Sequence, residues 1–298
     1  SGSIDVQDRQ PAYVFTPREI WDGLSGGETV LCNGLLSDWA SWQREGGRAF
    51  RTLVSVLESL TESEFGPMAP GELRKLSLDD ARLYPTLVMP YGTEVPLHQC
   101  SAGMRRIFAL AYLLVWAWEE HIRSGELLDR DPTGQITFII DEIESHLHPR
   151  WQRTIASSIL NVMHSLSAQA EVQLIAATHS PLVLASLETI FDPEMDAWFD
   201  FDLVSDENAN VHVEFVQRSF LKRGDATSWL TSDAFDLKYG VSAEAENVLV
   251  EADKALKNPG FSSDRARSLN DKLRSVLSET DPFWLRWRFV ADGRGWLR

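Results

Sequence analysis

The chain has 298 residues, of which 44% are hydrophobic, and its formal net charge is −16. This length and composition are typical of one or two globular domains and exclude a disordered chain. The acidic charge argues against nucleic-acid binding over the whole surface, because phosphate groups are bound by Lys and Arg. Binding through a local basic face remains an alternative.

Two further features concern the cellular compartment. The sequence has no apolar run of the ~18 residues that a membrane span needs, and no charged-then-apolar leader. We therefore expect a cytoplasmic protein that makes no membrane contact. Cys32 and Cys100 are the only cysteines and match no metal-ligand spacing, so we expect buried thiols rather than a disulfide.

The N-terminal segment is expected to begin with a hairpin and a short helix. Ile4–Val6 and Ala12–Phe15 have the pattern of two paired strands. Pro17–Leu24 follows as a short helix, with Thr16 as its cap and proline in its first turn. Leu24–Glu28 reads LSGGE and is interpreted as a glycine-rich turn.

A helical region and a second hairpin come next. Apolar residues in Ser37–Leu60 recur at helical spacing, with an interruption at the glycine pair 46–47, and the residues after Thr29 are expected to lead into this helix. Thr86–Met89 and Glu94–Leu97 flank a Pro-Tyr-Gly turn and are predicted to pair as a hairpin.

The segment His98–Arg106 reads HQCSAGMRR and predicts the start of a long helix. Ser101 is expected to cap it, with Ala102 and Gly103 in the first turn, and the helix is expected to run to about Ser124 and to end at Gly125. The apolar residues of its later face recur at helical spacing: Ile107, Leu110, Ala111, Leu114, Val115 and Trp118. Because small side chains leave the N–H groups of the first turn accessible, this helix start is a candidate anion site.

The segment Gln135–Ile140 reads QITFII and leads directly into Asp141 and Glu142. An unbroken run of β-branched and aromatic residues predicts a strand buried on both faces, as in parallel α/β sheets. The acids then lie at the carboxyl end of the strand, where open α/β sheets bind ligands. A Mg²⁺-dependent phosphoryl-transfer site would use Asp141 for the metal and Glu142 to polarise an attacking water. The alternative is a strand that ends in solvated acids which cap the next turn.

A second apolar strand, Val172–Ala177, is followed by the residues Thr-His-Ser-Pro. Because the carboxyl ends of parallel strands meet at one edge of a sheet, His179 is expected at the same edge as Asp141 and Glu142. Between the two strands, Pro149 is expected to begin a helix that packs on the sheet.

Three elements follow one another in this sequence: a helix start with small residues, a strand that ends in Asp-Glu, and a strand followed by His. This order resembles the C-terminal lobe of ABC-type ATPases. The likeness is strongest to the SMC-like and overcoming-lysogenisation-defect-like bacterial AAA proteins. The resemblance covers Leu97–Leu187. It implies ATP and Mg²⁺ as cofactors, Asp141 as metal ligand in a Walker B motif, and catalytic roles for Glu142 and His179. Nucleotide contacts are implied for four further residues: Ser101, Ala102, Gly103 and His146.

The match to this family has two departures. The loop at Ser101 reads SAGMRR and differs from the commoner LSGGQ motif. Leu24–Glu28 is closer to LSGGQ, but no strand that ends in Asp-Glu follows it at a suitable distance. The sequence also contains no G-x-x-x-x-G-K-[ST] loop, the Walker A motif that cradles the nucleotide phosphates. We therefore expect an upstream segment or a partner chain to carry that loop, with a degenerate relative as the third option.

The segment Glu144–His148 reads ESHLH and has a second interpretation, a zinc site formed by Glu144, His146 and His148. The family resemblance instead implies that this segment is the D-loop, which contacts the other subunit of a dimer. We favour the D-loop.

Residues 191–298 differ in character from the preceding lobe. Ala197–Val204 and Val211–Val216 predict a hairpin with Asp200 and Asp202 on one face. Such a pair could hold Mg²⁺ in a TOPRIM-like nuclease. The glutamate expected to accompany it is missing, so we favour a solvated strand face.

The end of the chain is predicted to be helical and aromatic. Ala243–Leu256 and Ser263–Leu277 are expected to form a helical hairpin. Asp281–Arg298 interleaves four arginines with Phe and Trp, a pattern suited to single-stranded nucleic acid or to docking of a terminal segment on a protein core. We favour docking.

These observations predict an α/β fold, the C-terminal lobe of an ABC-type P-loop NTPase with a largely parallel sheet flanked by helices. Residues 1–97 form a hairpin and helical region, 98–190 the ATPase lobe, and 191–298 an α+β extension. The expected function is ATP binding and hydrolysis as a head-to-tail dimer in DNA maintenance or anti-phage defence, with the chain inactive alone. The implied partners are a second copy or a Walker A-bearing chain, a nuclease and DNA. The alternatives are an ATP-gated scaffold with negligible turnover and a TOPRIM-like nuclease.

Overall fold

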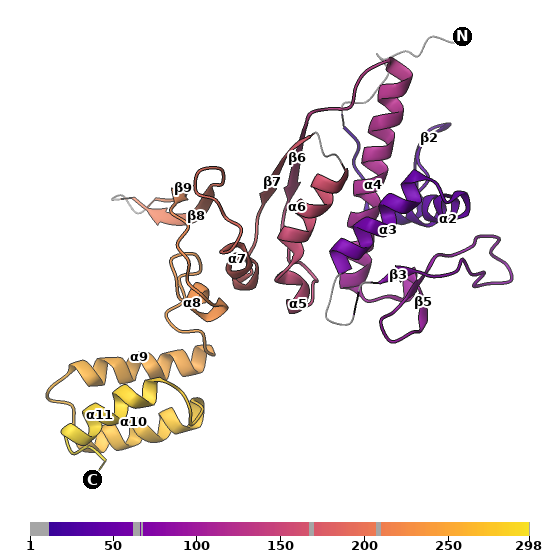
Figure 1. Cartoon of the computed structure of the whole chain (residues 1–298). Helices are drawn as coiled ribbons and strands as arrows, with labels where there is room; N and C mark the ends of the chain where they lie inside the picture. The colour runs from indigo at the N-terminus through magenta and orange to yellow at the C-terminus, as the bar shows by residue number, and fades with distance from the viewer. Residues whose placement is uncertain (1–11, 62–65, 67, 167–169, 207–209, 298) are drawn as a thin grey trace. The chain divides into compact units, whose positions relative to one another are not determined.

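The structure is a computed structural model that describes residues 12–61, 66, 68–166, 170–206 and 210–297. It is a mixed α/β chain with two compact units, divided between Glu194 and Met195 (Figure 1). Each unit has its own hydrophobic core. Within the described ranges, every helix is too short or too polar to cross a membrane.

The expected N-terminal hairpin is not formed as predicted. Ile4–Val6 lies outside the described residues, and Ala12–Phe15 is not a strand. Instead, the Phe15 ring packs edge-on against Trp116, with ring centroids 5.4 Å apart. This segment is therefore held by a tertiary aromatic contact that the local pattern does not reveal.

The first helix and the glycine-rich turn agree with the sequence analysis. Helix α1 (Pro17–Asp22) begins with a capping box in which Thr16 and Glu19 bond each other's backbone N–H groups. Strands β1 (Leu24–Gly26) and β2 (Thr29–Cys32) then form an antiparallel hairpin that turns at Gly27, where φ is +64°. The residues after Thr29 lead into a helix as expected, and strand β2 is an addition that was not predicted.

Helices α2 (Leu35–Glu45) and α3 (Arg48–Thr61) are separated at Gly46, whose left-handed φ of 62° ends α2. The predicted interruption is thereby confirmed. The chain then forms a small antiparallel sheet in the order β3-β4-β5 and enters α4 through a short 3₁₀ turn. Its strands are β3 (Ala69–Pro70), β4 (Thr86–Val88) and β5 (Glu94–Pro96).

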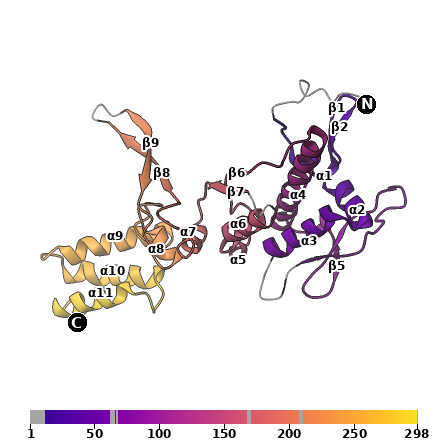
Figure 2. The same ribbon diagram turned by 45° about the horizontal axis from the view of Figure 1, so that its top comes forward.

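The long helix α4 (Ala102–Leu128) forms the centre of the first core. Its buried face packs on α3, which lies beside it in both views (Figure 2). Both helices contribute fully or almost fully buried residues to this core: Leu53 and Leu57 of α3, and Ile107, Phe108, Ala111 and Val115 of α4. Residues before and after position 97 therefore share one core, and the region boundary there lies within a single unit.

A buried polar group also joins α4 to α2. The Tyr112 hydroxyl donates to Asp38 Oδ2 over 2.8 Å and lies 2.9 Å from the sulfur of Cys32. Burial raises the pKa of the Tyr112 hydroxyl and of the Cys32 thiol. Cys32 and Cys100 are free and buried, as predicted.

Helix α4 continues past Gly125, where the sequence analysis ended it. It stops at Asp129, whose φ of 52° is left-handed. A Cβ at Gly125 would lie 2.7 Å from the carbonyl oxygen of Arg130. The glycine therefore allows the returning chain to approach the helix closely, and it does not act as the helix end.

Strands β6 (Gln135–Ile140) and β7 (Glu171–Ala176) pair in parallel, with helix α6 (Ile155–Leu166) alongside them (Figure 1). Helix α6 follows the single turn α5 (Pro149–Gln152), and α7 (Pro181–Leu187) follows β7. Every second residue of β6 is exposed, so the prediction of a strand buried on both faces is wrong. An unbroken apolar run reports the character of both faces and does not reveal whether each face is covered.

The open face of the β6–β7 pair retains large apolar side chains. Ile139 is 77% exposed and Ile175, its partner in the register, is 48% exposed. The opposite face, with Ile136, Phe138 and Ile140, packs against the first core. The pair therefore presents an uncovered, partly apolar sheet surface.

In the second unit, β8 (Trp198–Ser205) and β9 (Val211–Arg218) form the predicted antiparallel hairpin, a long ribbon in Figure 2. One end is anchored where the ring of Trp198 packs edge-on against Trp229, 5.9 Å away in helix α8 (Ala226–Leu230). One face of the ribbon is apolar and exposed. Its members are Phe199, Phe201, Leu203, Val211, Val213 and Phe215.

Three helices form the core of the second unit: α9 (Ala243–Lys257), α10 (Ser263–Val276) and α11 (Phe283–Gly293). Trp284, Trp287 and Trp296 are buried in this core. Arg286 pairs with Asp253 at 2.6 Å, and Arg294 donates to the carbonyl oxygen of Leu256 at the end of α9. The aromatic and arginine-rich terminus is thus docked on its own unit.

Candidate functional site

The candidate site lies where the two parallel strands end. The register pairs Ile140, the last residue of β6, with Ala176, the last residue of β7. Asp141 and Glu142 follow the first strand, and His179 follows the second three residues later. All three side chains are exposed. Parallel pairing thus brings together, at one edge of the sheet, residues that are almost forty positions apart in the sequence.

The turn after β6 has an unusual backbone. Glu142 and His146 adopt left-handed φ angles of 48° and 62°, which non-glycine residues rarely do. Such a conformation costs of order 1–3 kcal/mol and persists only where surrounding contacts hold it. Ile143 and Leu147 provide anchors, since both side chains are buried, and Ile143 N–H donates to the carbonyl of Ala177 over 3.2 Å. The structure therefore fixes Glu142 in a strained position beside the end of β7.

The start of α4 contacts this turn directly. The Ser101 hydroxyl accepts from Met104 N–H, so the predicted cap is confirmed. A Cβ on Gly103 would collide with the carbonyl oxygen of His146. Arg106 Nη2 donates to the carbonyl oxygens of Asp141 at 3.3 Å and Glu142 at 2.9 Å. Local packing thus accounts for the small residue at position 103, and it draws the α4 start and the acids together.

The side chain of Glu144 has bonds that differ from those of a zinc ligand. Its carboxylate accepts from the Thr178 hydroxyl over 2.5 Å and from His179 N–H over 2.7 Å. His148 caps α5, its ring Nδ1 accepting from Arg150 N–H. Among the residues that the structure describes, no group of three or more His, Cys, Asp or Glu is arranged to hold a metal. The Glu144 carboxylate is thus bonded to the loop after β7, and the D-loop role of this segment stays a prediction.

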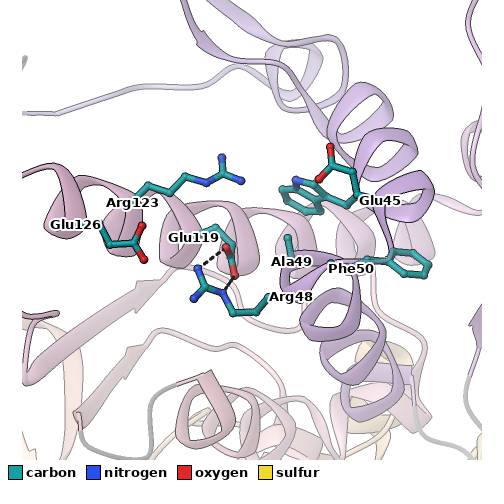
Figure 3. A pocket seen from close by; sticks show the side chains of 9 residues that line it. Glu45, Arg48, Ala49, Phe50, Glu119, Arg123 and Glu126 are labelled. Carbon is teal, nitrogen blue, oxygen red and sulfur yellow. Dashed lines mark hydrogen bonds and ion pairs between the residues drawn. The ribbon is translucent and has the colours of Figure 1, made fainter.

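A second polar constellation was not predicted from the sequence. Arg48 of α3 forms a two-bond ion pair with Glu119 of α4, at 3.0 and 2.9 Å, beside a cavity of about 230 Å³ (Figure 3). Glu119 is buried, and Arg123 and Glu126 lie further along the same helix. At a rise of 1.5 Å per residue, Glu119 lies about 27 Å along α4 from Ser101. The cavity is thus remote from the acids, and its ion pair joins two helices.

The Asp200 and Asp202 pair of the second unit faces an arginine. Arg218 Nη2 donates to Asp202 over 2.7 Å, and Arg218 Nε lies 3.7 Å from Asp200 Oδ2. Burial, and then the neighbouring Asp202, raise the pKa of Asp200, while Arg218 opposes the shift. The guanidinium offsets one of the two carboxylate charges and bonds Asp202 directly, which weakens the support for a metal-binding role.

A parallel strand pair with acids and a histidine at its carboxyl edge, next to a capped helix start, is consistent with an α/β fold of the P-loop NTPase class. A model of the family "AAA domain, putative AbiEii toxin, Type IV TA system" matches residues 25–185, more than half of the chain. The chain belongs to this family. The predicted resemblance to AAA-type ATPases is confirmed at this level, while the finer subfamily stays a prediction.

Two curated proteins are similar to parts of the chain. The retron Vc95 probable ATPase of Vibrio cholerae serotype O1 biovar El Tor is 31% identical over 100 residues, 34% of this chain and 18% of that protein. The Septu protein PtuA of Bacillus mycoides (strain KBAB4) is 28% identical over 186 residues, 57% of this chain and 24% of that protein. The chain thus spans about a quarter or less of the length of these relatives.

Solved structures with partial likeness include SMC-type ATPase heads. One, from a study of ATP-driven dimerization and DNA-stimulated activation of SMC ATPases, gives a TM-score of 0.36 at 14% identity, over 61% of this chain and 89% of that chain. Another, an Smc head bound to the C-winged helix domain of ScpA, gives 0.32 at 15% identity, over 59% and 44%. TM-scores this low indicate only a partial likeness.

Proposed function

We propose that this chain supplies the signature helix, the Walker B strand and the switch histidine of an ABC-type ATPase site that closes between two subunits. The observation that carries the proposal is the register of β6 and β7, which sets Asp141, Glu142 and His179 at one strand edge. Phosphoryl transfer depends mainly on positioning and on stabilisation of charge, and this edge carries groups suited to both.

Each residue has a role in this proposal. Asp141 contributes one exposed carboxylate to Mg²⁺, which fits the habit of this ion to bind one or two protein carboxylates together with phosphates and water. When bound, Mg²⁺ neutralises charge on the phosphates. Glu142 orients the attacking water and accepts its proton, and His179 contacts the γ-phosphate.

The α4 start acts on a second nucleotide in this proposal. The first-turn N–H groups at Ser101, Ala102 and Gly103 suit an anion, and His146 lies against the same turn. No phosphate-cradling loop occurs in this sequence, so the anion comes from the subunit across a head-to-tail interface. The uncovered face with Ile139 and Ile175 supports further polypeptide packing there. The complete ATPase is this chain together with the segment that carries the Walker A loop, either upstream or on a partner chain.

The biological setting is proposed from the similarities. Likeness to a retron ATPase and to a Septu protein supports a role in anti-phage defence over general DNA maintenance. A nuclease partner and DNA are the corresponding proposed partners. The net charge of −16 favours DNA contact through a partner or a local face.

The first test concerns Glu142. In the complete ATPase, Glu142→Gln keeps the shape and loses the base, so ATP binding and dimerisation persist while turnover falls ~10²-fold or more. Glu171→Gln, at the opposite end of the β6–β7 pair, is the matched control and keeps wild-type turnover. Turnover of Glu142→Gln within a factor of about three of wild type removes Glu142 from the mechanism.

The second test concerns action across the interface. Ser101→Arg leaves ATP binding by the monomer intact, while dimerisation and hydrolysis fail together. Mixing it with a Walker A variant restores activity, because one site of each mixed dimer carries both defects and the other carries neither. If mixed dimers form and no activity returns, Ser101 is a helix cap only and the two-subunit mechanism is wrong.

A further inference from the structure

The carboxylate of Glu144 links the two strand ends that carry the proposed catalytic groups. Glu144 lies two residues after Glu142, and its oxygens accept from the Thr178 hydroxyl at 2.5 Å and from His179 N–H at 2.7 Å. It thus bonds the backbone of the switch histidine itself. No motif in the sequence predicts this contact, because its partners lie 34 and 35 positions away.

The contact has the properties of a rigid positioning device. A carboxylate has only acceptors, and here two donors from successive residues approach its two oxygens, so neither donor is left without a partner. Hydrogen bonds to an ionised acceptor are shorter and about twice as strong as neutral ones. Because Glu144 is only half-buried, the ionised carboxylate remains solvated on one side.

Further bonds restrain the same loop on both sides of His179. Thr178 Oγ1 also accepts from Ser180 N–H over 3.0 Å. The Ser180 hydroxyl donates to Gln152 Oε1 at 2.7 Å, and Gln152 Nε2 donates to the carbonyl of Leu147 at 3.0 Å. The loop after β7 is therefore joined to the turn after β6 through side chains, and Glu144 is the member that contacts His179.

We propose that Glu144 is a positioning residue that sets His179 relative to Glu142, so that the two act on the same phosphate and water. This inference rests on the proposed ATPase function. Misplacing a catalytic group by about 1 Å can reduce a rate ~10²-fold, so losing this contact changes turnover more than ATP binding.

The test compares three variants in the complete ATPase. Glu144→Ala lowers kcat about tenfold or more, with KM for ATP changed less than about threefold. Glu144→Gln recovers most of this loss, since its amide oxygen accepts from His179 N–H and its amide N–H₂ faces the Thr178 oxygen. Glu171→Ala, which removes a side-chain bond between the same strands at their other end, leaves kcat unchanged.

A double-mutant cycle with His179→Ala separates positioning from general stability. If Glu144 acts through His179, adding Glu144→Ala to His179→Ala lowers kcat no further. Additive losses overturn the proposal. A Glu144→Gln variant that is as inactive as Glu144→Ala also overturns it, because that result indicates a role for the charge of Glu144. If Glu142→Gln and His179→Ala themselves keep wild-type turnover, it is the proposed function that fails.

A second pair of variants covers the case in which Glu144→Ala does not fold. Thr178→Val removes one of the two donors to Glu144 with little change in volume, and Thr178→Ser retains it. We expect Thr178→Val to lower kcat and to be non-additive with His179→Ala, while Thr178→Ser remains close to wild type. Equal turnover in the two Thr178 variants contradicts the proposal.

Discussion

One pair of acids directly follows a strand of this molecule and another lies within a strand, in very different surroundings. Asp141 and Glu142 follow the end of β6 and are exposed, whereas Asp200 and Asp202 lie within β8 and face Arg218 at 3.7 and 2.7 Å. In the second pair an arginine of the protein itself compensates part of the charge. Acids that extend past the end of the ladder are free to bind the ligand that we propose, whereas acids that face an arginine of the neighbouring strand form structural ion pairs.

The largest expected difference between the two pairs is in catalysis. Glu142→Gln lowers ATP turnover of the complete ATPase ~10²-fold or more, while Asp200→Asn with Asp202→Asn changes it less than about threefold. Steady-state ATPase assays on both variants check this. Metal-dependent DNA cleavage that survives Glu142→Gln and is abolished by Asp200→Ala would reverse the assignment of the two pairs.

The next effect sharpens the description of the first pair. Gly103→Ala places a Cβ against the carbonyl oxygen of His146, and we expect a loss of about 1–3 kcal/mol in the free energy of unfolding as the turn that carries Glu142 shifts. Urea unfolding monitored by circular dichroism measures it. Gly134→Ala is the control, because an added Cβ there meets no atom within 4 Å. Equal stability of the two variants shows that the α4 start and the turn are not in close contact.

A smaller effect tests the ion pair of the second unit. Arg218→Met removes the cation beside Asp200 and Asp202, and we expect the free energy of unfolding to fall by about 1–2 kcal/mol, toward the low end because Arg218 is partly exposed. In a background of Asp200→Asn with Asp202→Asn the same substitution is nearly neutral. A cost that persists in that background assigns the stabilisation to packing of the arginine stem.

The smallest effect is a pH dependence at Asp200. Its pKa is raised above the ordinary 3.8, chiefly by burial, so the folded chain holds this proton to higher pH than the unfolded chain. The stability that follows is fully present below 3.8 and is lost as pH rises through the raised folded pKa. Asp200→Asn removes this loss, and urea unfolding over that window should show the variant gaining on wild type as pH rises. A constant difference across the window contradicts the raised pKa.

The sequence by itself determined the local elements and the order of the motifs. Thr16 and Ser101 cap helices, Gly46 separates two of them, and two apolar runs form strands, since caps, left-handed glycines and periodicity act over a few residues. The adjacent acids after β6 and the histidine after β7 were also recognisable, because parallel strands bring their carboxyl ends to one edge.

Only the tertiary structure decided which groups meet across the chain. Glu144 bonds the loop of His179, and Arg218 forms ion pairs with Asp200 and Asp202. The helix α4 continues through Gly125, a residue type that often ends helices. Coverage of the β6–β7 pair was decided in the same way, and one of its faces is open. In each case the outcome depends on a partner that is distant in sequence, and strand register and packing select that partner.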